Sequence, residues 1–519
     1  MRRFRLDGPL MPGRGRVFAV HAACIRGVEA FPVTVEISAS GSIPGLTIVG
    51  MADAAVLEAR MRIRCALRAC DFEIPRCALT VSLAPGDVRK TGSGLDLPIA
   101  VAILALSNQI SIDGLDDHLF VGELGLDGSV SSVNGEVAYQ LLARDQGLSF
   151  VSGLGGPRVL FHGVSCKTLA FLSDLRLGVG RALRDHEATG PVRAPAPSPI
   201  DYSDVVGQEI AKRGIAVAAA GELGMLMVGS PGSGKTMLAR RMTGILPPIE
   251  EGERQEALCV HSVVGEPIDF LLRGERPFRS PHHSISMAGL VGGGRPVRPG
   301  EISLAHGGVL YLDELGEFPP NALQLLRQPL EDGSIRVVRV DGAYTFPARF
   351  QLIAASNPCP CGYLGDREIP CRCSEASIER YRSKLTGPLA DRIDLILDVA
   401  RPDPDLIVRG AEGRSSADLR ADVMRGREFR RWREHGMDAD EPTELQGDAK
   451  STVASQDLTD EGRSSLLEIS KRKHLTGRGI VRLTRIARTI ADMAESDAID
   501  SAHLLEASLL QGRRGDGDA

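Results

Sequence analysis

The sequence predicts an α/β protein of several domains, with a parallel sheet that carries a glycine-rich loop and a helical region near the end of the chain. Three observations predict this class. A short apolar run ends in a glycine-rich turn that opens a helix over 225–237, and later apolar runs end in acidic or amide residues. Such runs are typical of buried parallel strands. Residues 464–510 space their apolar side chains at helical intervals.

The size and composition of the chain limit the class of protein. Its 519 residues suffice for about three or four domains of roughly 150 residues each. With 43% hydrophobic and 25% charged residues, the chain is globular, which excludes disorder, collagen and coiled coil as the dominant class. The net charge of −6 does not attract polyanions, so a nucleic-acid site would need locally concentrated basic residues.

We expect a cytoplasmic protein without a membrane segment. The most apolar stretch, Leu97–Leu106, is far shorter than the about 18 residues that a membrane span needs. Asp7, Gly8 and Pro9 interrupt the basic N-terminus before an apolar signal region could form. The 10 cysteines are too dilute for a disulfide scaffold.

Changes in composition predict the domain boundaries. The Pro- and Ala-rich segment Ala188–Ser198 has no periodic pattern and holds the chain semi-extended. A weaker change follows Asp398, where an apolar strand gives way to an Arg-rich region in which 436–452 is typical of a solvated connection. We predict an N-terminal domain over 1–187, a linker over 188–200, a core over 201–400 and a helical domain over 401–519.

The glycine-rich loop has the sequence GSPGSGKT over 229–236, between the apolar strand Met225–Val228 and a helical run that begins at Met237. This is the phosphate-binding pattern G-x-x-x-x-G-K-[ST] in its strand-loop-helix context. Lys235 is expected to reach the β- and γ-phosphates, and Thr236 to ligate Mg²⁺. The residues expected to bind the nucleotide are Gly229, Ser230, Pro231, Gly232, Ser233, Gly234, Lys235 and Thr236.

Two later strands end in residues that suit the same site. Gly308–Leu312 is followed by Asp313 and Glu314, and Phe350–Ala355 is followed by Ser356 and Asn357. Ligands of parallel sheets bind at the carboxyl edge, where these side chains emerge. Asp313 is expected to hold Mg²⁺, Glu314 to polarise the attacking water, and Asn357 to bridge the γ-phosphate and that water.

This order of motifs, followed by Asp391-Arg392 before the strand Leu395–Val399, resembles an AAA+ ATPase. The resemblance implies ATP and Mg²⁺ as cofactors. It also implies that Arg392 acts in trans as an arginine finger, which requires a homo-oligomer, expected as a hexamer. Gly207 and Gln208 resemble the segment beside the adenine, and Arg478 resembles the sensor 2 arginine of the lid.

The segment Pro277–His306, with the sequence PFRSPHHSISMAGLVGGGRPVRPGEISLAH, closely resembles the YifB or ComM subfamily, magnesium-chelatase-like proteins of the helix-2-insert AAA+ clade. The resemblance covers most of the chain, including IPGLTIVG over 43–50 and GLDLPIA over 94–100. The sequence departs from the family at 221–224, where a Gly-His pair is expected, and at Ser230, where a second Pro is usual. Backbone-driven phosphate binding tolerates both changes.

The N-terminal domain resembles the Lon-protease and ribosomal-protein-S5-like α+β fold, so peptidase activity has to be considered. A Ser-Lys dyad needs a lysine within reach of the serine. No lysine lies between Thr91 and Cys166, and the nucleophile position falls on Gly94, one residue from Ser93. We expect a non-catalytic binding or assembly module.

The macromolecule on which this ATPase acts depends on its surface, because the ATPase motifs are shared by ComM-type DNA helicases and magnesium chelatase subunits. Two β-rich runs within Ser334–Phe346 are joined by Asp341-Gly342, a strong hairpin signal. In this clade such a hairpin projects toward the pore of the ring. The arginines of this hairpin could contact DNA phosphates or simply form a solvated face, and the sequence leaves both interpretations open. The candidate DNA contacts are Arg295, Arg298, Arg336 and Arg339.

Four cysteines, Cys359, Cys361, Cys371 and Cys373, form the pattern C-x-C-x₉-C-x-C. Four thiolates can complete a tetrahedral Zn²⁺ site, although each pair has one intervening residue where two to four are usual. A structural Zn²⁺ site and free cysteines in a reducing compartment both remain open.

The sequence therefore predicts a Mg²⁺- and ATP-dependent DNA motor. From the resemblance, its expected role is branch migration that assists homologous recombination in natural transformation. Two alternatives are kept. One is a chelatase-like ATPase that remodels a protein partner, and the other is a nucleotide-gated scaffold without turnover.

Overall fold

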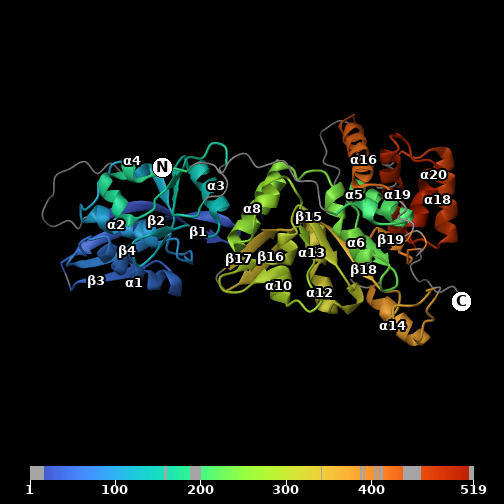
Figure 1. The fold of residues 1–519 in the computed structure, drawn as a ribbon, viewed down its shortest axis with the longest axis horizontal. Helices are drawn as coiled ribbons and strands as arrows, with labels where there is room; N and C mark the ends of the chain where they lie inside the picture. The colour runs from blue at the N-terminus through green and yellow to red at the C-terminus, as the bar shows by residue number, and fades with distance from the viewer. Residues whose placement is uncertain are drawn as a thin grey trace.

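The computed structural model describes residues 17–512 except 42, 157–160, 187–199, 341, 367, 386–388, 390–391, 403–404, 406–407, 409–412 and 437–456. The predicted linker, apart from Ile200, lies outside the described residues. The predicted connection over 436–452, apart from its first residue, and Asp341 also lie outside them. Figure 1 shows an elongated molecule with a sheet near the N-terminus at one end, a second sheet in the middle, and the C-terminal helices at the other end.

Residues 17–185 form a mixed sheet of eight strands in the order β10-β9-β8-β5-β1-β2-β4-β3. Its strands are β1 (Val17–Arg26), β2 (Glu29–Ser40), β3 (Gly45–Val49), β4 (Ala78–Ala84), β5 (His118–Phe120), β8 (Ser149–Ser152), β9 (Cys166–Thr168) and β10 (Arg184–Asp185), with a separate pair β6 (Glu123–Leu124) and β7 (Val130–Ser131). Its helices are α1 (Ala54–Ala69), α2 (Asp96–Leu106), α3 (Glu136–Gln146) and α4 (Val179–Ala182). Helix α2 is buried along its whole length, and Asp96 at its start lies 2.6 Å from Arg62, because a buried carboxylate needs a partner.

The second sheet is entirely parallel, with strand order β12-β15-β18-β11-β19. Its strands are β11 (Met225–Val228), β12 (Phe278–Arg279), β15 (Gly308–Leu312), β18 (Phe350–Ser356) and β19 (Leu395–Asp398). The helices α5 (Glu209–Gly221), α6 (Lys235–Arg240), α7 (Met242–Ile245) and α8 (Glu251–Val264) belong to the same part of the chain. The predicted α/β class with a parallel sheet is confirmed, because the short apolar runs are its buried strands.

Short elements fill the chain between these strands. They are α9 (Asp269–Leu272), α10 (Met287–Val291), β13 (Gly292–Gly293), β14 (Arg298–Pro299), α11 (Glu301–Leu304), α12 (Pro320–Leu325), α13 (Arg327–Asp332), the hairpin β16 (Ser334–Arg339) and β17 (Gly342–Pro347), and α14 (Glu375–Leu385). The predicted hairpin is present, with Arg339 paired to Gly342. Because β17 begins at Gly342, this glycine belongs to the second strand and not to the turn predicted at Asp341-Gly342.

The first sheet contacts the middle of the molecule beside this hairpin. The Arg26 guanidinium, at the end of β1, lies 5.6 Å from the ring centre of Tyr344 on β17. The Gly135 N–H, just before α3, donates a 3.0 Å hydrogen bond to the carbonyl of Ser262 on α8. Apolar side chains of both helices share one cluster, which includes Val137. A Cβ atom at Gly342 would lie 2.5 Å from the Arg26 guanidinium, so the N-terminal part of the chain contacts the hairpin near its tip.

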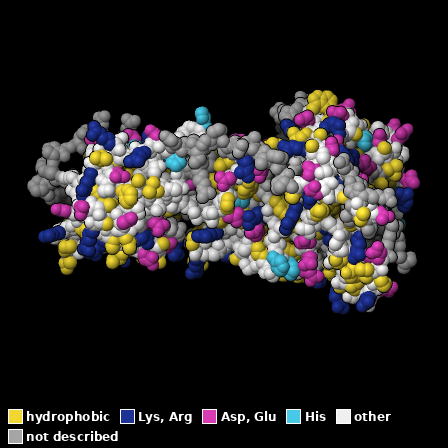
Figure 2. Space-filling model, viewed as in Figure 1, with side chains coloured by type: hydrophobic (Ala, Val, Ile, Leu, Met, Phe, Trp, Pro, Cys, Tyr) yellow, Lys and Arg dark blue, Asp and Glu magenta, His cyan; other side chains and the backbone are white. Residues whose placement is uncertain are grey.

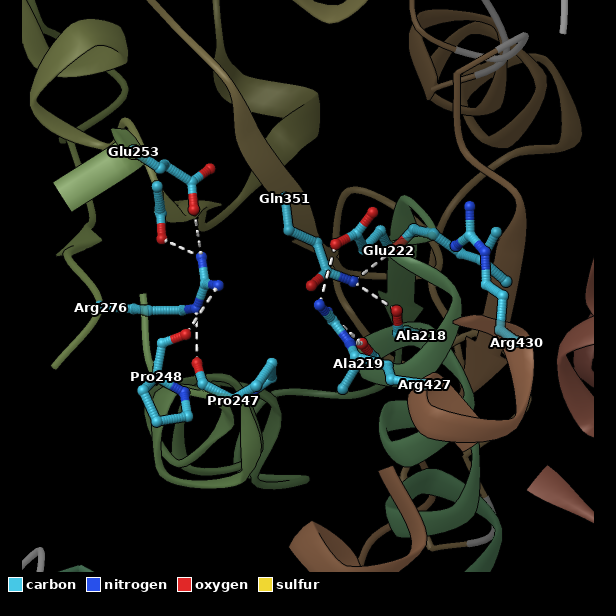
Figure 3. Close-up of polar contacts among 12 residues, drawn as sticks. Ala218, Ala219, Glu222, Pro247, Pro248, Glu253, Arg276, Gln351, Arg427 and Arg430 are labelled. Carbon is cyan, nitrogen blue, oxygen red and sulfur yellow. Dashed lines mark hydrogen bonds and ion pairs between the residues drawn. The ribbon is translucent and has the colours of Figure 1, made fainter. Parts of the chain in front are cut away.

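The C-terminal helices pack beside α5 (Figure 1). They are α16 (Ser416–Gly436), α18 (Asp460–Arg472), α19 (Gly477–Met493) and α20 (Ser501–Leu510). Figure 3 shows how α16 and β18 meet at the end of α5. Arg427 donates to the Ala219 carbonyl and pairs with Glu222 at 2.9 Å, while the Gln351 amide donates to Ala218 at 2.7 Å. These side chains satisfy carbonyls that a helix end leaves without partners.

The described part of the chain holds no helix that is both long enough and apolar enough to cross a membrane.

Candidate functional site

The glycine-rich loop joins β11 to α6 at the carboxyl edge of the parallel sheet. Gly232 and Gly234 have φ angles of +81° and +91°, which favour glycine because side chains are strained there. At Gly229 a Cβ atom would lie 2.2 Å from the Val399 carbonyl oxygen, so a side chain is excluded. The glycines therefore shape the loop and its close contact with the chain after β19.

Lys235 lies inside this loop. Its ammonium group donates to the carbonyls of Gly229 at 2.6 Å and Ser230 at 3.0 Å, and lies 3.4 Å from the Asn357 amide oxygen. Burial lowers the pKa of Lys235, whereas the nearby Asp313 and Glu314 carboxylates oppose that change. A cation among carbonyls at the mouth of a glycine loop can exchange these partners for phosphate oxygens.

Thr236 and Asp313 form an oxygen pair beside Lys235. The Thr236 hydroxyl donates to Asp313 Oδ2 at 2.9 Å, and the Tyr311 hydroxyl donates to Thr236 Oγ1 at 3.3 Å. A hydroxyl and a carboxylate are the oxygen ligands that Mg²⁺ prefers, with the remaining positions left to water and phosphate. The donor set therefore fits Mg²⁺. The contact of Tyr311 was not foreseen, although its place next to Leu312 and Asp313 is visible in the sequence.

Glu314 follows Asp313 with a φ angle of +51°, which is uncommon for a residue with a side chain. Strained backbone of this kind often marks a functional residue. The Glu314 carboxylate is 54% exposed and lies 3.5 Å from His283 Nδ1. The rings of His282 and His283 lie 4.0 Å apart, and His282 instead contacts the Ser284 hydroxyl at 2.8 Å. Sequence analysis assigned no role to His283, although the adjacent pair His282-His283 could have indicated one.

The structure brings two of the other predicted residues to this site. Asn357 follows β18 and contacts Lys235, as described above. Gln208, with a φ angle of +62°, donates to the Ser233 carbonyl at 3.4 Å and to the Ala400 carbonyl. The preceding Gly207 also has a positive φ angle, of +68°. The segment beside Gln208 is thus fastened to the phosphate loop.

The two predicted arginines of the shared site lie on other elements. Arg392 is 39% exposed and forms an ion pair with Glu331 on α13. Arg478 lies exposed in the first turn of α19, after the N-cap Thr476. About two turns further along α19, Arg485 pairs with Asp394 at 3.0 Å and so joins this helix to the start of β19.

The candidate DNA contacts gather around two hairpins. On β16, Arg336 and Arg339 are exposed, whereas Ile335 and Val337 are buried. A Cβ atom at Gly293 would lie 2.8 Å from the Arg339 guanidinium, so Arg339 rests against β13. Arg295 and Arg298, both exposed, lie in the turn and first residue of β14 that follow β13. In the view of Figure 2, basic and acidic side chains are interspersed, so these four arginines are a local feature.

The tip of the β16–β17 hairpin is apolar. Val338 is 64% exposed and Val340 is fully exposed. Exposed apolar side chains at the end of a projecting element are typical of a contact with another macromolecule.

The four clustered cysteines converge despite their short spacing. All four Sγ atoms lie within 4.8 Å of one another. Backbone N–H groups, led by that of Arg372, lower the pKa of the Cys361 thiol to about 6. Despite opposing backbone N–H groups, partial burial and the neighbouring thiols raise the pKa values of Cys371 and Cys373. The arrangement can hold a metal ion.

The N-terminal part shows no serine-lysine pair at the position considered from the sequence. The Ser93 hydroxyl donates to the Glu123 carboxylate at 2.6 Å. The ammonium group of Lys90 is buried and bonds the Pro85 carbonyl.

Comparison with known proteins relates most of the chain to one family. Residues 201–406 match the family described as magnesium chelatase, subunit ChlI; 35–152 match subunit ChlI of Mg-chelatase; and 413–511 match its C-terminal region. The uncharacterized protein YifB of Escherichia coli is 40% identical over 503 residues, which cover 94% of this chain and 96% of that protein. The competence protein ComM of Haemophilus influenzae is 38% identical over 501 residues, with the same two coverages. The magnesium-chelatase 67 kDa subunit of Chlorobaculum parvum is 31% identical over 162 residues, covering 31% of this chain and 23% of that protein.

Proposed function

Because this chain belongs to the YifB/ComM-type magnesium-chelatase-like family of AAA+ proteins, we propose that it is an ATP-hydrolysing ring motor that acts on DNA. Its proposed role is branch migration during homologous recombination in natural transformation, in the cytoplasm. The observation that carries the ATPase part is the convergence of Lys235, Thr236, Asp313, Glu314 and Asn357 at one sheet edge.

Each of these groups has a proposed task in ATP hydrolysis. Lys235 would bind the β- and γ-phosphates after leaving the carbonyls that it now contacts. Thr236 and Asp313 would hold Mg²⁺, which supplies charge neutralisation of the phosphates when bound. Glu314 would accept a proton from the attacking water, and Asn357 would orient that water beside the γ-phosphate.

Assembly into a ring, expected as a hexamer, is part of the proposal. Arg392 would stabilise the charge of the γ-phosphate bound by a neighbouring subunit. Its ion pair with Glu331 would then have to break, so this pair is a natural point of control. Arg478 would contact the phosphates from the helical lid.

Phosphate contact by Arg295, Arg298, Arg336 and Arg339 is the proposed link to DNA. These side chains are exposed, and Arg339 rests against β13, the strand that precedes Arg295 and Arg298. Four arginines from each subunit would concentrate positive charge in a ring despite the net charge of −6.

The test is an ATP-dependent branch-migration assay on a labelled four-way junction. Wild type should separate the junction with ATP and Mg²⁺, and Glu314→Gln should not. If wild type hydrolyses ATP but leaves the junctions intact, the proposed role on DNA is wrong.

A second candidate is an ATPase that remodels a protein partner. The apolar tip formed by Val338 and Val340 favours it, because apolar side chains suit a protein surface better than a phosphate backbone. ATPase stimulation by a protein but by no DNA would favour this candidate.

The domain division stays a prediction, and so does a Lon-protease-like N-terminal domain without catalytic activity. The contact of Ser93 with Glu123 supports the proposal that Ser93 belongs to no Ser-Lys dyad.

A further inference from the structure

We propose that the four clustered cysteines bind one Zn²⁺ and that this metal site clamps residues 359–373 against the phosphate loop, so that ATP hydrolysis depends on it. The effect on hydrolysis rests on the proposed ATPase function, whereas metal binding does not.

The separations of the sulfur atoms fit a single ion. Cys359 Sγ lies 3.4 Å from Cys361 Sγ and 3.7 Å from Cys371 Sγ, and the last two lie 3.5 Å apart. A tetrahedral site with Zn–S bonds of about 2.3 Å separates its sulfurs by about 3.8 Å. A disulfide would instead bring two of the sulfur atoms to about 2.05 Å from each other and would not include the other sulfur atoms. Three mutual separations of similar length instead surround one centre.

The fourth cysteine completes this set. Cys373 Sγ accepts a hydrogen bond from the Cys361 N–H at 3.4 Å, and the Cys373 N–H donates to Cys371 Sγ at 3.5 Å. Such backbone donors favour thiolates, which are the ligands of zinc. Four sulfur ligands in a tetrahedron select Zn²⁺ over Mg²⁺. Cys359 is buried and the other three are partly exposed, which leaves a path for the ion.

The loop between the two cysteine pairs packs on the phosphate loop. A Cβ atom at Gly362 would lie 2.7 Å from Pro231 and 3.8 Å from the Asn357 side chain, so the backbone there closely approaches both. The φ angle of Gly362 is +85°, which also favours glycine. The cysteine segment therefore contacts the phosphate loop and the proposed water-orienting residue together.

Polar contacts fasten the same loop. The Asp366 carboxylate is 3% exposed, accepts from the N–H groups of Glu368 and Ile369 at 3.0 and 3.1 Å, and lies 3.3 Å from Arg401. The Ser230 hydroxyl of the phosphate loop faces this carboxylate and helps to lower its pKa. Ser230 stands where a second Pro is usual in the family, and a Pro has no hydroxyl to donate.

These contacts couple the metal to the nucleotide site. With Zn²⁺ bound, the short segment 359–373 is cross-linked at both ends, and Asp366 is held facing Ser230. Without the metal, the segment gains conformational freedom and no longer fixes Pro231 or Asn357. Hydrolysis should fall even though no metal-binding cysteine contacts the nucleotide.

Metal binding is tested first, on the full chain. Zinc content is measured by mass spectrometry in wild type, in Cys361→Ser/Cys373→Ser and in Cys65→Ser, which alters a partly exposed cysteine outside the cluster. We expect about one zinc per chain in wild type and in Cys65→Ser, and none in the double variant. The site would be overturned if wild type contained no zinc and also showed no cobalt–thiolate absorption after addition of Co²⁺.

The clamp is tested separately, without altering a cysteine. Asp366→Ala should keep its zinc but lower kcat/KM for ATP by roughly 10- to 100-fold, the loss expected for a hydrogen bond to a charged group. Removal of zinc from wild type with a nitrogen chelator that ignores Mg²⁺ should lower kcat, and added Zn²⁺ should restore it. Unchanged hydrolysis in both experiments would overturn the clamp while leaving the ATPase in place. A wild type that hydrolyses no ATP with its zinc bound would instead remove the proposed function.

Discussion

The Thr236 hydroxyl donates a 2.9 Å hydrogen bond to the Asp313 carboxylate, across 77 positions of the chain. The contact exists because β11 and β15 flank β18 in a parallel sheet, so the residues that follow them meet at one edge. An oxygen pair at this place can share a hard cation. Strand order therefore assembles the metal-binding part of the nucleotide site.

Glu314→Gln should bind ATP with unchanged affinity and lower kcat by at least about 100-fold, because an amide cannot accept the proton of the attacking water. Steady-state hydrolysis and equilibrium binding of a fluorescent ATP analogue measure the two effects. Glu317→Gln alters a nearby exposed acid and should keep kcat. Undiminished hydrolysis in Glu314→Gln would remove Glu314 from this role.

His283→Ala should raise basal hydrolysis about two- to fivefold, because His283, 3.5 Å from the Glu314 carboxylate, competes with the attacking water for it. His282→Ala is the matched control, since His282 contacts Ser284 and should leave basal kcat unchanged. The same steady-state assay measures both. Equal effects of the two changes would show that the contact with Glu314 does not matter.

Arg392→Ala should lower kcat by about 1000-fold if the arginine acts on a neighbouring subunit's nucleotide. Mixing it with Lys235→Ala subunits should restore activity, because about a quarter of randomly formed interfaces then combine an intact site with an intact arginine. Glu331→Gln, which removes the partner of Arg392 in the chain, should not lower kcat. A mixture as inactive as its components would contradict action in trans.

Arg427→Ala should lower the free energy of unfolding by about 2 kcal/mol, because the Ala219 carbonyl and Glu222 lose a partly buried charged partner. Burial lowers the pKa of Arg427, which agrees with a position enclosed between α16 and α5. Arg425→Ala removes a more exposed pair on the same helix and should cost less than about 1 kcal/mol. Calorimetric unfolding compares the variants.

The parallel sheet could be predicted because its strands are continuous apolar runs bounded by polar residues. Met225–Val228 has the predicted bounds, and β18 is one residue longer than predicted, ending at Ser356. The hairpin was predicted as well, but its pairing reaches Gly342, so its connection begins at Val340. Local patterns therefore determined the elements and most of the phosphate-binding loop.

Contacts between distant segments could not be predicted in this way. The approach of His283 to Glu314 depends on the path of the chain after β12, and the approach of Gly362 to Pro231 depends on how the cysteine loop folds back. The C-x-C spacing argued against a metal site, yet the sulfur atoms converge because both pairs lie at the ends of one turn-rich loop. Such contacts follow from the tertiary fold.

The central claim is that this AAA+ protein acts on DNA through its basic hairpins. The direct measurement is steady-state ATP hydrolysis without DNA and with single-stranded DNA, duplex DNA or a four-way junction, at two salt concentrations. The account predicts stimulation that weakens with salt, is lost in Arg336→Ala/Arg339→Ala and is kept in Arg60→Ala, which alters an exposed arginine of α1. Basal hydrolysis that no DNA stimulates would contradict it and favour a protein substrate.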